Sequence, residues 1–379
     1  MTGNFGDQIG LTATGLDVRT PRVWLERVRT GQLTGAESAA TVLLVYRVWL
    51  VALALKALGS GWDVAWHFRW LRDDLAPPHL VNLAGDAIVI ALVLFHWYTR
   101  LGVDKLALRL MEAGIIVFLA SAPVDVINHR LNGLDITTWS LTHAGLYLGT
   151  AIMIAGAIRG WRAHSGGLPS RALVLGGLWF LFLENVLFPN QHQEYGVLEI
   201  TSWDRGEPYA EPSLVQFAAE QIGRPMDRAS VVNFSLPVPS WVYPVWIVGA
   251  AMLVLLLARH SVGLRWTATT IATAYIGWRC LIWLLLAATD FPLSAVPFLL
   301  LGGALAIDVV CRLGLPWPAE AAVGATLVAA AVYLGGYLQS HLLVAPPIDY
   351  WSAPVAAAAL LVGWATARSL IARGRSTRA

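Results

Sequence analysis

The chain has 379 residues, of which 57% are hydrophobic and only 13% are charged, and its formal net charge is +2. Soluble domains carry about a quarter charged residues, so this composition excludes a soluble globular protein and indicates an integral membrane protein. The near-neutral balance, without a basic stripe, also excludes a nucleic-acid-binding protein. The lipid bilayer is therefore the first partner that the sequence predicts.

The first 37 residues are polar and basic, and they contain neither an apolar core nor a small-residue cleavage site. Residues 1–37 are therefore predicted to be a retained cytoplasmic segment rather than a signal peptide. About ten apolar runs follow, each long enough to cross roughly 30 Å of hydrocarbon as a helix. The predicted fold class is all-α, a polytopic helical bundle. The expected spans are residues 38–60, 80–99, 105–128, 140–159, 170–189, 241–259, 264–288, 294–313, 318–340 and 350–372.

Basic residues between these runs set the expected orientation. They gather in alternate connections, and such connections face the cytoplasm. Both termini are then cytoplasmic in a multi-pass protein of the cell membrane. The chain divides into a first transmembrane half (38–189), an external loop or cap (190–240) and a second half with a basic cytoplasmic tail (241–379). The basic residues of the inner connections are Arg100, Lys105, Arg109, Arg159, Arg162, Arg171, Arg259, Arg265 and Arg312.

The first span ends in a motif typical of metal sites. Asp63 and His67 are four residues apart, so on a helix both side chains project from one face. His79 follows Pro77 and Pro78, which are expected to start the next helix with fixed φ and to direct His79 toward that face. Two imidazoles and one carboxylate from two helices then form a three-ligand site.

The motif recurs between the third and fourth spans. A shift of 62 residues carries the first aspartate and histidine onto Asp125 and His129, and a shift of 64 carries the later histidine onto His143. Ser140 and Thr142 are the candidate N-caps of the helix that holds His143. Because both motifs lie at the outer ends of spans, the sequence predicts a duplicated hairpin with two metal sites near the external face.

Each triad leaves coordination positions open, as a metal needs in order to bind oxygen, water or substrate. Copper, non-haem iron and zinc all accept such ligands. Asp73 and Asp135 are candidates for the hydrogen bonds that fix histidine orientation, with plain loop carboxylates as the alternative. Glu184, near the outer end of the fifth span beside Asn185 and His192, is a further candidate to support a site.

The first motif resembles a stretch of the C subunit of the copper membrane monooxygenases, the family of the particulate methane and ammonia monooxygenases. Those subunits carry Asp-x-x-Trp-His-x4-Arg-Asp, followed shortly by Pro-Ser-His. The resemblance implies that the aspartate and the two histidines bind one copper ion. The matching residues here are Asp63, Trp66, His67, Arg72, Asp73, Pro77 and His79.

The second motif resembles the same family's Asn-x3-His-x13-His triad, which binds a neighbouring copper. Asp125, His129 and His143 have that spacing, with aspartate in place of asparagine. The extra negative charge would favour a harder metal such as iron, the connector before His79 is one residue shorter, and Pro78 replaces the serine. The resemblance covers about residues 60–150, as in a divergent relative.

The resulting hypothesis is a copper-dependent, or alternatively iron-dependent, monooxygenase-like membrane enzyme that oxidises a small or lipophilic substrate with dioxygen. The alternative is a transporter of copper or another divalent metal, or a metal-holding membrane protein. A transporter predicts a ladder of polar ligands across the membrane, which residues 241–379 do not suggest. A metal-free structural protein would leave the repeated spacing unexplained. The sequence leaves open the electron donor and whether the chain forms a homo-oligomer or has partner subunits.

Chemically notable residues of the second half are expected to have structural roles. Cys280 and Cys311 fall within predicted spans, so they are expected to be small core residues. Arg279 and Asp308 are candidates for an ion pair between the seventh and eighth spans.

Overall fold

The computed structural model describes residues 21–71, 76–132, 137–166 and 170–376, with the backbone alone at 129–132 and 371–376. Regular structure in these ranges is helical, without a strand, so the predicted all-α class is confirmed. The elements are α1 (Pro21–Arg29), α2 (Gly35–His67), α3 (Pro77–Thr99), α4 (Lys105–Asn132), α5 (Leu141–His164), α6 (Arg171–Asp204), α7 (Pro212–Gln221), α8 (Arg228–Ser235), α9 (Val242–Trp246), the π-helix η1 (Ile247–Ala251), α10 (Met252–Val262), α11 (Thr267–Ala288), α12 (Leu299–Val310), α13 (Trp317–Leu342), the short 3-10 helix η2 (Tyr350–Ser352) and α14 (Ala353–Ser376).

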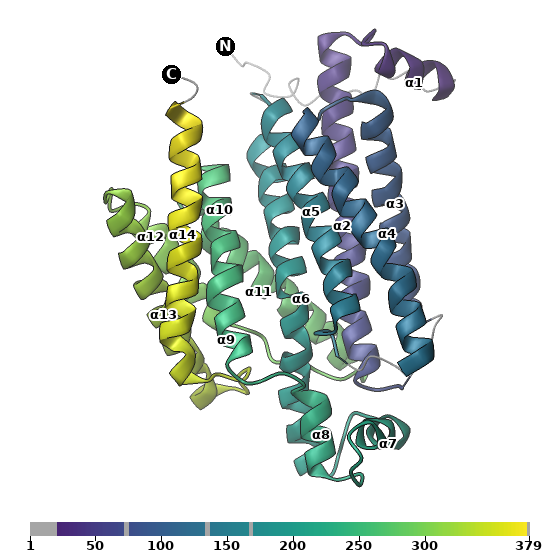
Figure 1. Cartoon of the computed structure of the whole chain (residues 1–379), viewed down its shortest axis with the longest axis vertical. Helices are drawn as coiled ribbons and strands as arrows, with labels where there is room; N and C mark the ends of the chain where they lie inside the picture. Colours follow the sequence, from purple (N-terminus) through teal and green to yellow (C-terminus); the bar gives the residue numbers. More distant parts are fainter. Residues whose placement is uncertain (1–20, 72–75, 133–136, 167–169, 377–379) are drawn as a thin grey trace, which may run out of the picture.

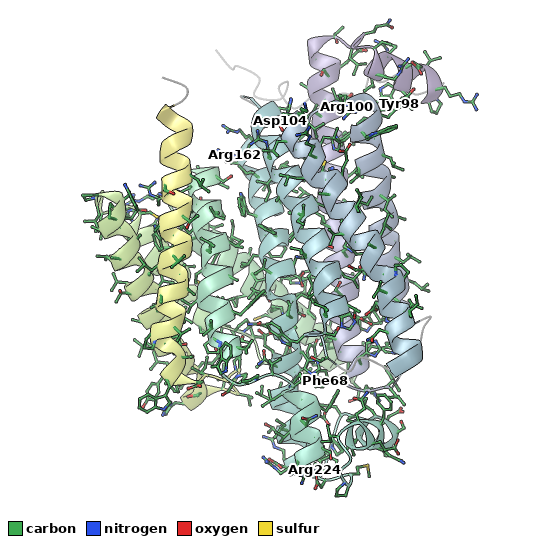
Figure 2. All side chains as sticks on the ribbon, viewed as in Figure 1. Phe68, Tyr98, Arg100, Asp104, Arg162 and Arg224 are labelled. Atoms are coloured by element: carbon green, nitrogen blue, oxygen red, sulfur yellow. The ribbon has the colours of Figure 1, made fainter. Side chains whose placement is uncertain are left out.

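Nine stretches of the described chain are helical, long and apolar enough to cross a membrane. They are α2 to α6, α9 joined to α10, α11, α13, and η2 joined to α14. The predicted polytopic membrane bundle is therefore confirmed. α1 and the C-terminal end of α14 lie at one end of the bundle, and α7 and α8 lie at the other (Figure 1). The basic residues Arg100 and Arg162 lie at the α1 end, whereas Phe68 lies near α7 and α8 (Figure 2).

The eighth predicted span, residues 294–313, differs from the structure. Its helix, α12, has only 12 residues, a length of roughly 18 Å at 1.5 Å per residue. The preceding residues 291–298 are non-helical, because Pro292 and Pro297 cannot continue a helical hydrogen-bond ladder. The prediction of a regular membrane-crossing helix here is wrong.

Backbone groups of this non-helical segment are satisfied by the neighbouring helices. The Ala295 N–H donates to the Glu194 carbonyl at 2.9 Å, and the Val296 carbonyl accepts from Gln339 Nε2 at 2.8 Å. The Ser294 hydroxyl accepts from Arg279 Nη2 at 2.8 Å. Irregular backbone at membrane depth is tolerated where protein groups satisfy it in this way.

The predicted ion pair between Arg279 and Asp308 is not formed. Its guanidinium bonds the Glu194 carboxylate, with Nη1 to Oε2 at 2.7 Å. Asp308 instead pairs with Arg259 at 3.1 Å and accepts the Thr269 N–H at 2.8 Å. The sequence prediction was wrong because the buried partner of Arg279 is on α6, far away in the chain.

α6 continues well past the boundary predicted at residue 189. Pro189 is inside the helix, which runs on to Asp204, and two further helices, α7 and α8, occupy part of the predicted loop 190–240. Side chains from Asn190 to Glu194 are buried although they are polar. Their polarity resembles that of an exposed loop, which explains the wrong boundary. Gly196 lets α8 approach, since a Cβ there would lie 1.9 Å from the Ser235 carbonyl oxygen.

The first four long helices form two hairpins with the same internal contact. In the first hairpin a Cβ on Gly85 would lie 2.8 Å from the Ala52 carbonyl oxygen, and in the second a Cβ on Gly149 would lie 2.8 Å from the Gly114 carbonyl oxygen. These positions are related by the same shifts of 62 and 64 residues that relate the two motifs. The helix contact is thus duplicated together with the motif.

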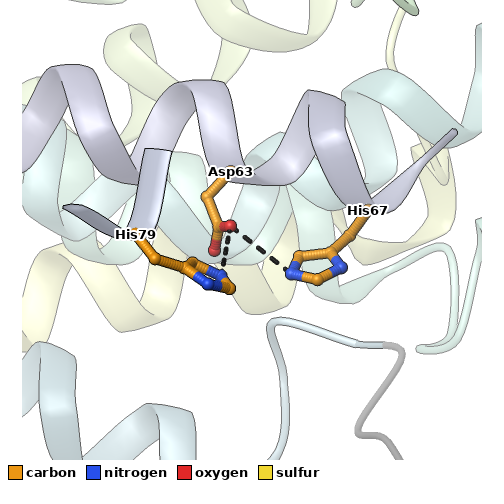
Figure 3. Close-up of side chains that lie close together, drawn as sticks. All are labelled: Asp63, His67 and His79. Carbon is orange, nitrogen blue, oxygen red and sulfur yellow. Dashed lines mark ion pairs between the residues drawn. The ribbon is translucent and has the colours of Figure 1, made fainter. Parts of the chain in front are cut away.

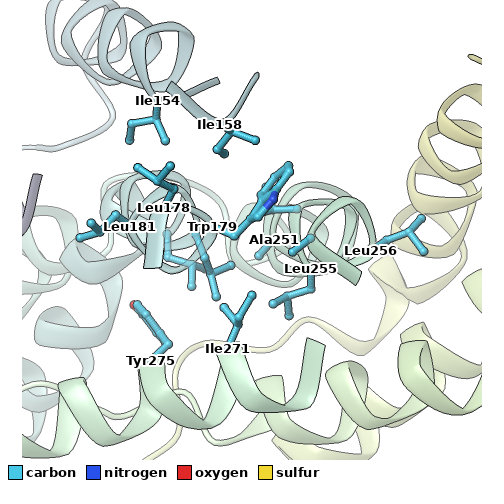
Figure 4. Close-up of a cluster of buried hydrophobic side chains, with 14 of the residues drawn as sticks. Ile154, Ile158, Leu178, Trp179, Leu181, Ala251, Leu255, Leu256, Ile271 and Tyr275 are labelled. Carbon is cyan, nitrogen blue, oxygen red and sulfur yellow. The ribbon is translucent and has the colours of Figure 1, made fainter. Parts of the chain in front are cut away.

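α6 joins the two halves of the bundle. It packs against α2 and α5 of the first half and against α10 and α11 of the second. Figure 4 shows the buried core at this junction, where Ile154 of α5, Leu178 of α6, Leu255 of α10 and Ile271 of α11 gather.

Candidate metal centre

Asp63, His67 and His79 come together at the end of the bundle that carries α7 and α8. The His79 Nε2 atom lies 2.8 Å from Asp63 Oδ1, and the His67 Nε2 atom lies 3.4 Å from the same oxygen (Figure 3). One ligand atom from each residue lies within 4.8 Å of the other two. The three side chains predicted as one metal site therefore converge on one point.

Local sequence explains this convergence. α2 runs without a break to His67, so Asp63 and His67 are one helical turn apart on one face. Pro77 and Pro78 occupy the first positions of α3, where a missing N–H costs nothing, and His79 follows in the first turn. The prolines thus direct His79 toward the α2 pair, as predicted.

The donor set of this triad fits a transition metal. Two imidazole nitrogens and a carboxylate oxygen suit copper, iron or zinc, and three protein ligands leave positions open for a further molecule. The side chains are 27% to 33% exposed, so a small molecule can reach them. His67 Nδ1 has no hydrogen-bond partner among the described residues. Asp73, predicted to orient a histidine, lies outside those residues.

Two residues of the second motif, Asp125 and His143, lie close together in the structure. The His143 Nε2 atom of α5 lies 3.6 Å from Asp125 Oδ1 of α4. The other ring nitrogen, Nδ1, lies 2.9 Å from the Thr137 carbonyl oxygen. Metal-binding histidines commonly donate that second N–H to a carbonyl, which orients the ring so that the opposite nitrogen can ligate. His129 is in the last turns of α4, and its side chain, like residue Asp135, lies outside the described part of the structure.

Ser140 is the N-cap of α5, as predicted. Its hydroxyl accepts the His143 N–H at 3.2 Å, which satisfies one of the free donors of the first helical turn. Thr142 contacts the Ser140 hydroxyl at 3.1 Å rather than capping the helix. The cap fixes where α5 starts, and this sets the position along the helix axis at which His143 faces α4.

Both motifs open into one cavity of about 730 Å³. It lies between the two hairpins and α6, and most of its lining surface is apolar, although both hairpins and α6 also contribute polar and charged side chains. A shared cavity makes the two sites parts of one functional region. The polar and charged lining residues are Lys56, Ser60, Asp63, His67, His79, Asn82, Asp86, Asp125, Thr137, Thr138, His143, Tyr147, Thr150, Glu184, Asn185 and His192.

Glu184 lines this cavity but is not grouped with either triad. It is buried, and its Oε1 accepts a hydrogen bond from Gln191 Nε2 at 3.0 Å. Its sequence neighbours also line the cavity while bonding elsewhere: Asn185 donates to the Tyr147 carbonyl at 3.1 Å, and His192 Nε2 lies 2.8 Å from the Phe234 carbonyl oxygen. Glu184 is therefore placed to touch a molecule in the cavity.

Sequence reasoning missed a buried ion pair in the cavity wall. Lys56 of α2 bonds the Asp86 carboxylate of α3, and its ammonium lies 4.5 Å from the centre of the Phe118 ring. A lone lysine in an apolar span was the available signal, because a charge at that depth needs a partner. Seven residues before Asp63, Lys56 lies roughly 10 Å deeper along the helix.

The fold and this site define an all-α, polytopic membrane protein with a candidate metal centre at one end of its bundle. No family model, no curated protein and no solved structure gives a match to this chain. The resemblance of residues 60–150 to the monooxygenase C subunit thus stays a prediction.

Proposed function

We propose that this protein is a membrane metalloenzyme that holds copper at Asp63, His67 and His79 and oxidises a small or lipophilic substrate with dioxygen. The observation that carries the proposal is the convergence of these three ligands on the wall of a largely apolar cavity. Non-haem iron is the alternative metal. The resemblance of the motif to the copper monooxygenases supports the choice of copper and of oxygen chemistry.

The chain's own residues have defined roles in this proposal. Asp63, His67 and His79 hold the ion and leave coordination positions open toward the cavity. The apolar lining excludes water and accepts a substrate that arrives from the bilayer. When bound, copper supplies the oxygen chemistry, which the protein directs by position and electrostatics. Asp125, His129 and His143 are proposed to hold a second ion, with the carboxylate of Asp125 favouring a harder metal.

The reaction class fixes what must be supplied from outside. A monooxygenase inserts one atom of dioxygen into the substrate and reduces the other to water, which consumes two electrons and two protons. An external reductant must therefore donate electrons, and a partner subunit or a membrane quinol would fill that role.

Oxygen consumption tests this function. Copper-loaded protein in lipid bilayers with a reductant should consume dioxygen faster when a small lipophilic substrate is added, and His67→Ala should abolish the increase. His341→Ala is the matched control, because His341 is exposed and, among the described residues, its side chain bonds only its own helix and its neighbour Ser340. An increase that survives His67→Ala would contradict the proposal.

The transporter alternative makes a different prediction in sealed vesicles. A metal ion leaving the triad inward along the cavity would meet the Lys56–Asp86 ion pair, in which the ammonium already neutralises the carboxylate, so no free anionic ligand continues the path at that point. Vectorial metal uptake that His67→Ala abolishes, without oxygen chemistry, would favour transport over catalysis.

We propose an orientation in the cell membrane with both termini cytoplasmic and the metal centre near the external face. It rests on the basic connections at the α1 end of the bundle, such as Arg100 and Arg162 (Figure 2). A reporter fused after Arg373 should be cytoplasmic, whereas one inserted at the exposed Glu207, between α6 and α7, should be external. The reverse pattern would overturn the orientation.

A further inference from the structure

A second group of metal-ligating side chains lies in the other half of the chain. His260 is near the end of α10, Cys311 caps the end of α12, and Glu320 is in the first turn of α13. One ligand atom from each residue lies within 4.8 Å of the other two. We propose that His260, Cys311 and Glu320 form a zinc site that joins these three helices.

The short connection between α12 and α13 brings Cys311 close to Glu320. Gly314, at φ +66°, and Pro316, the N-cap of α13, make the connection short and turn the chain back. The turn places the C-cap residue Cys311 beside Glu320, one turn into the next helix. His260 reaches the same point from α10, so the three ligands come from separate helices.

The Glu320 carboxylate keeps acceptor capacity beyond its existing partners. Its Oε2 pairs with Arg368 at 3.1 Å, and its Oε1 accepts from Trp364 Nε1 at 3.2 Å. The His260 Nε2 atom lies 3.9 Å from the same Oε1. A carboxylate offers about four lone-pair sites, so Oε1 can bind an ion that lies toward His260 and Cys311.

Neighbouring charge is compatible with a divalent ion. The guanidinium of Arg259, adjacent to His260, is neutralised by the buried Asp308 at 3.1 Å. A zinc ion would displace the thiol proton of Cys311, and the resulting thiolate and the Glu320 carboxylate, which Arg368 shares, would be the two anionic ligands of the ion. Arg368 stays bound to the far oxygen of Glu320 and orients the carboxylate.

The donor chemistry fits zinc. Histidine nitrogen, cysteine sulfur and glutamate oxygen are all established zinc ligands, and zinc accepts a tetrahedral set with water in the fourth position. The Asp63 triad contains no sulfur, so a thiolate signal distinguishes the two sites. The inference is independent of the proposed monooxygenase function, because it concerns other helices.

Cobalt binding provides the test, since Co²⁺ substitutes for zinc and reports thiolate ligation. The protein in lipid with Co²⁺ should show a near-ultraviolet thiolate-to-cobalt charge-transfer band, and Zn²⁺ should displace it. Cys311→Ser should lose the band, whereas Cys280→Ser, which changes the other free cysteine, should keep it. Absence of the band in the unmodified protein, or its survival in Cys311→Ser, would overturn the site.

A second measurement needs no variant. Alkylation of the unmodified protein by a maleimide, followed by peptide mass spectrometry, should show that Zn²⁺ slows modification of Cys311 at least about tenfold relative to Cys280, as expected for a metal-bound thiolate. Equal rates at Cys311 with and without Zn²⁺ would contradict the proposal, even if the Cys311→Ser protein failed to fold.

Discussion

His67→Ala is expected to lower the metal affinity of the Asp63 site more than about 100-fold, because even the loss of a residue that only supports a ligand costs 10–100-fold. Metal analysis of the purified protein in lipid should then show the loss of about one bound equivalent. The ion at the Asp125 site should stay, since Asp125 and His143 are contributed by other helices.

Two variants sharpen this result. The double change His67→Ala/His129→Ala should lose both equivalents, while His341→Ala, which changes an exposed histidine outside the cavity, should lose neither. Unchanged metal content in the double variant would refute both sites.

Arg279→Met is expected to destabilise the bundle by about 3–5 kcal/mol, the usual cost of breaking a buried ion pair from one side. The Glu194 carboxylate would keep its hydrogen bond from Tyr243, at 2.8 Å, but would lose the guanidinium that neutralises it. Ser294, which precedes α12, would also lose its donor. A lower melting temperature in detergent measures the effect.

Two further variants distinguish the contribution of the Arg279 charge from that of its packing. Arg279→Met/Glu194→Gln should recover most of the loss, because a glutamine accepts the Tyr243 hydroxyl without a buried charge. Arg159→Met, which removes an exposed pair with Asp104, should cost about 1 kcal/mol or less. A double variant as unstable as Arg279→Met alone would show that the guanidinium acts by packing, not by charge.

The sequence predicted those features that depend on local spacing. Asp63 and His67 share a helix face because four residues make about one turn, and Pro77 and Pro78 determined where His79 lies. Nine apolar runs became membrane-length helices for the same reason, since hydropathy and length act locally.

Features set by distant partners could not be predicted in this way. α6 passes through Pro189 because its polar continuation is buried against the second half and α8, which residue polarity alone conceals. Arg279 and Lys56 pair with carboxylates whose identity depends on helix packing. In the sequence, Cys311 resembles a small core residue of an apolar span. Its proximity to His260 and Glu320 depends on how the helices pack.

Electron paramagnetic resonance of the Cu²⁺-loaded protein tests most directly whether Asp63, His67 and His79 bind one metal ion. A His129→Ala background leaves the first site as the main copper site. We expect hyperfine coupling to two imidazole nitrogens, reduced to one nitrogen in His79→Ala. A copper signal without nitrogen coupling, or one that His79→Ala leaves unchanged, would show that these three residues do not bind the ion.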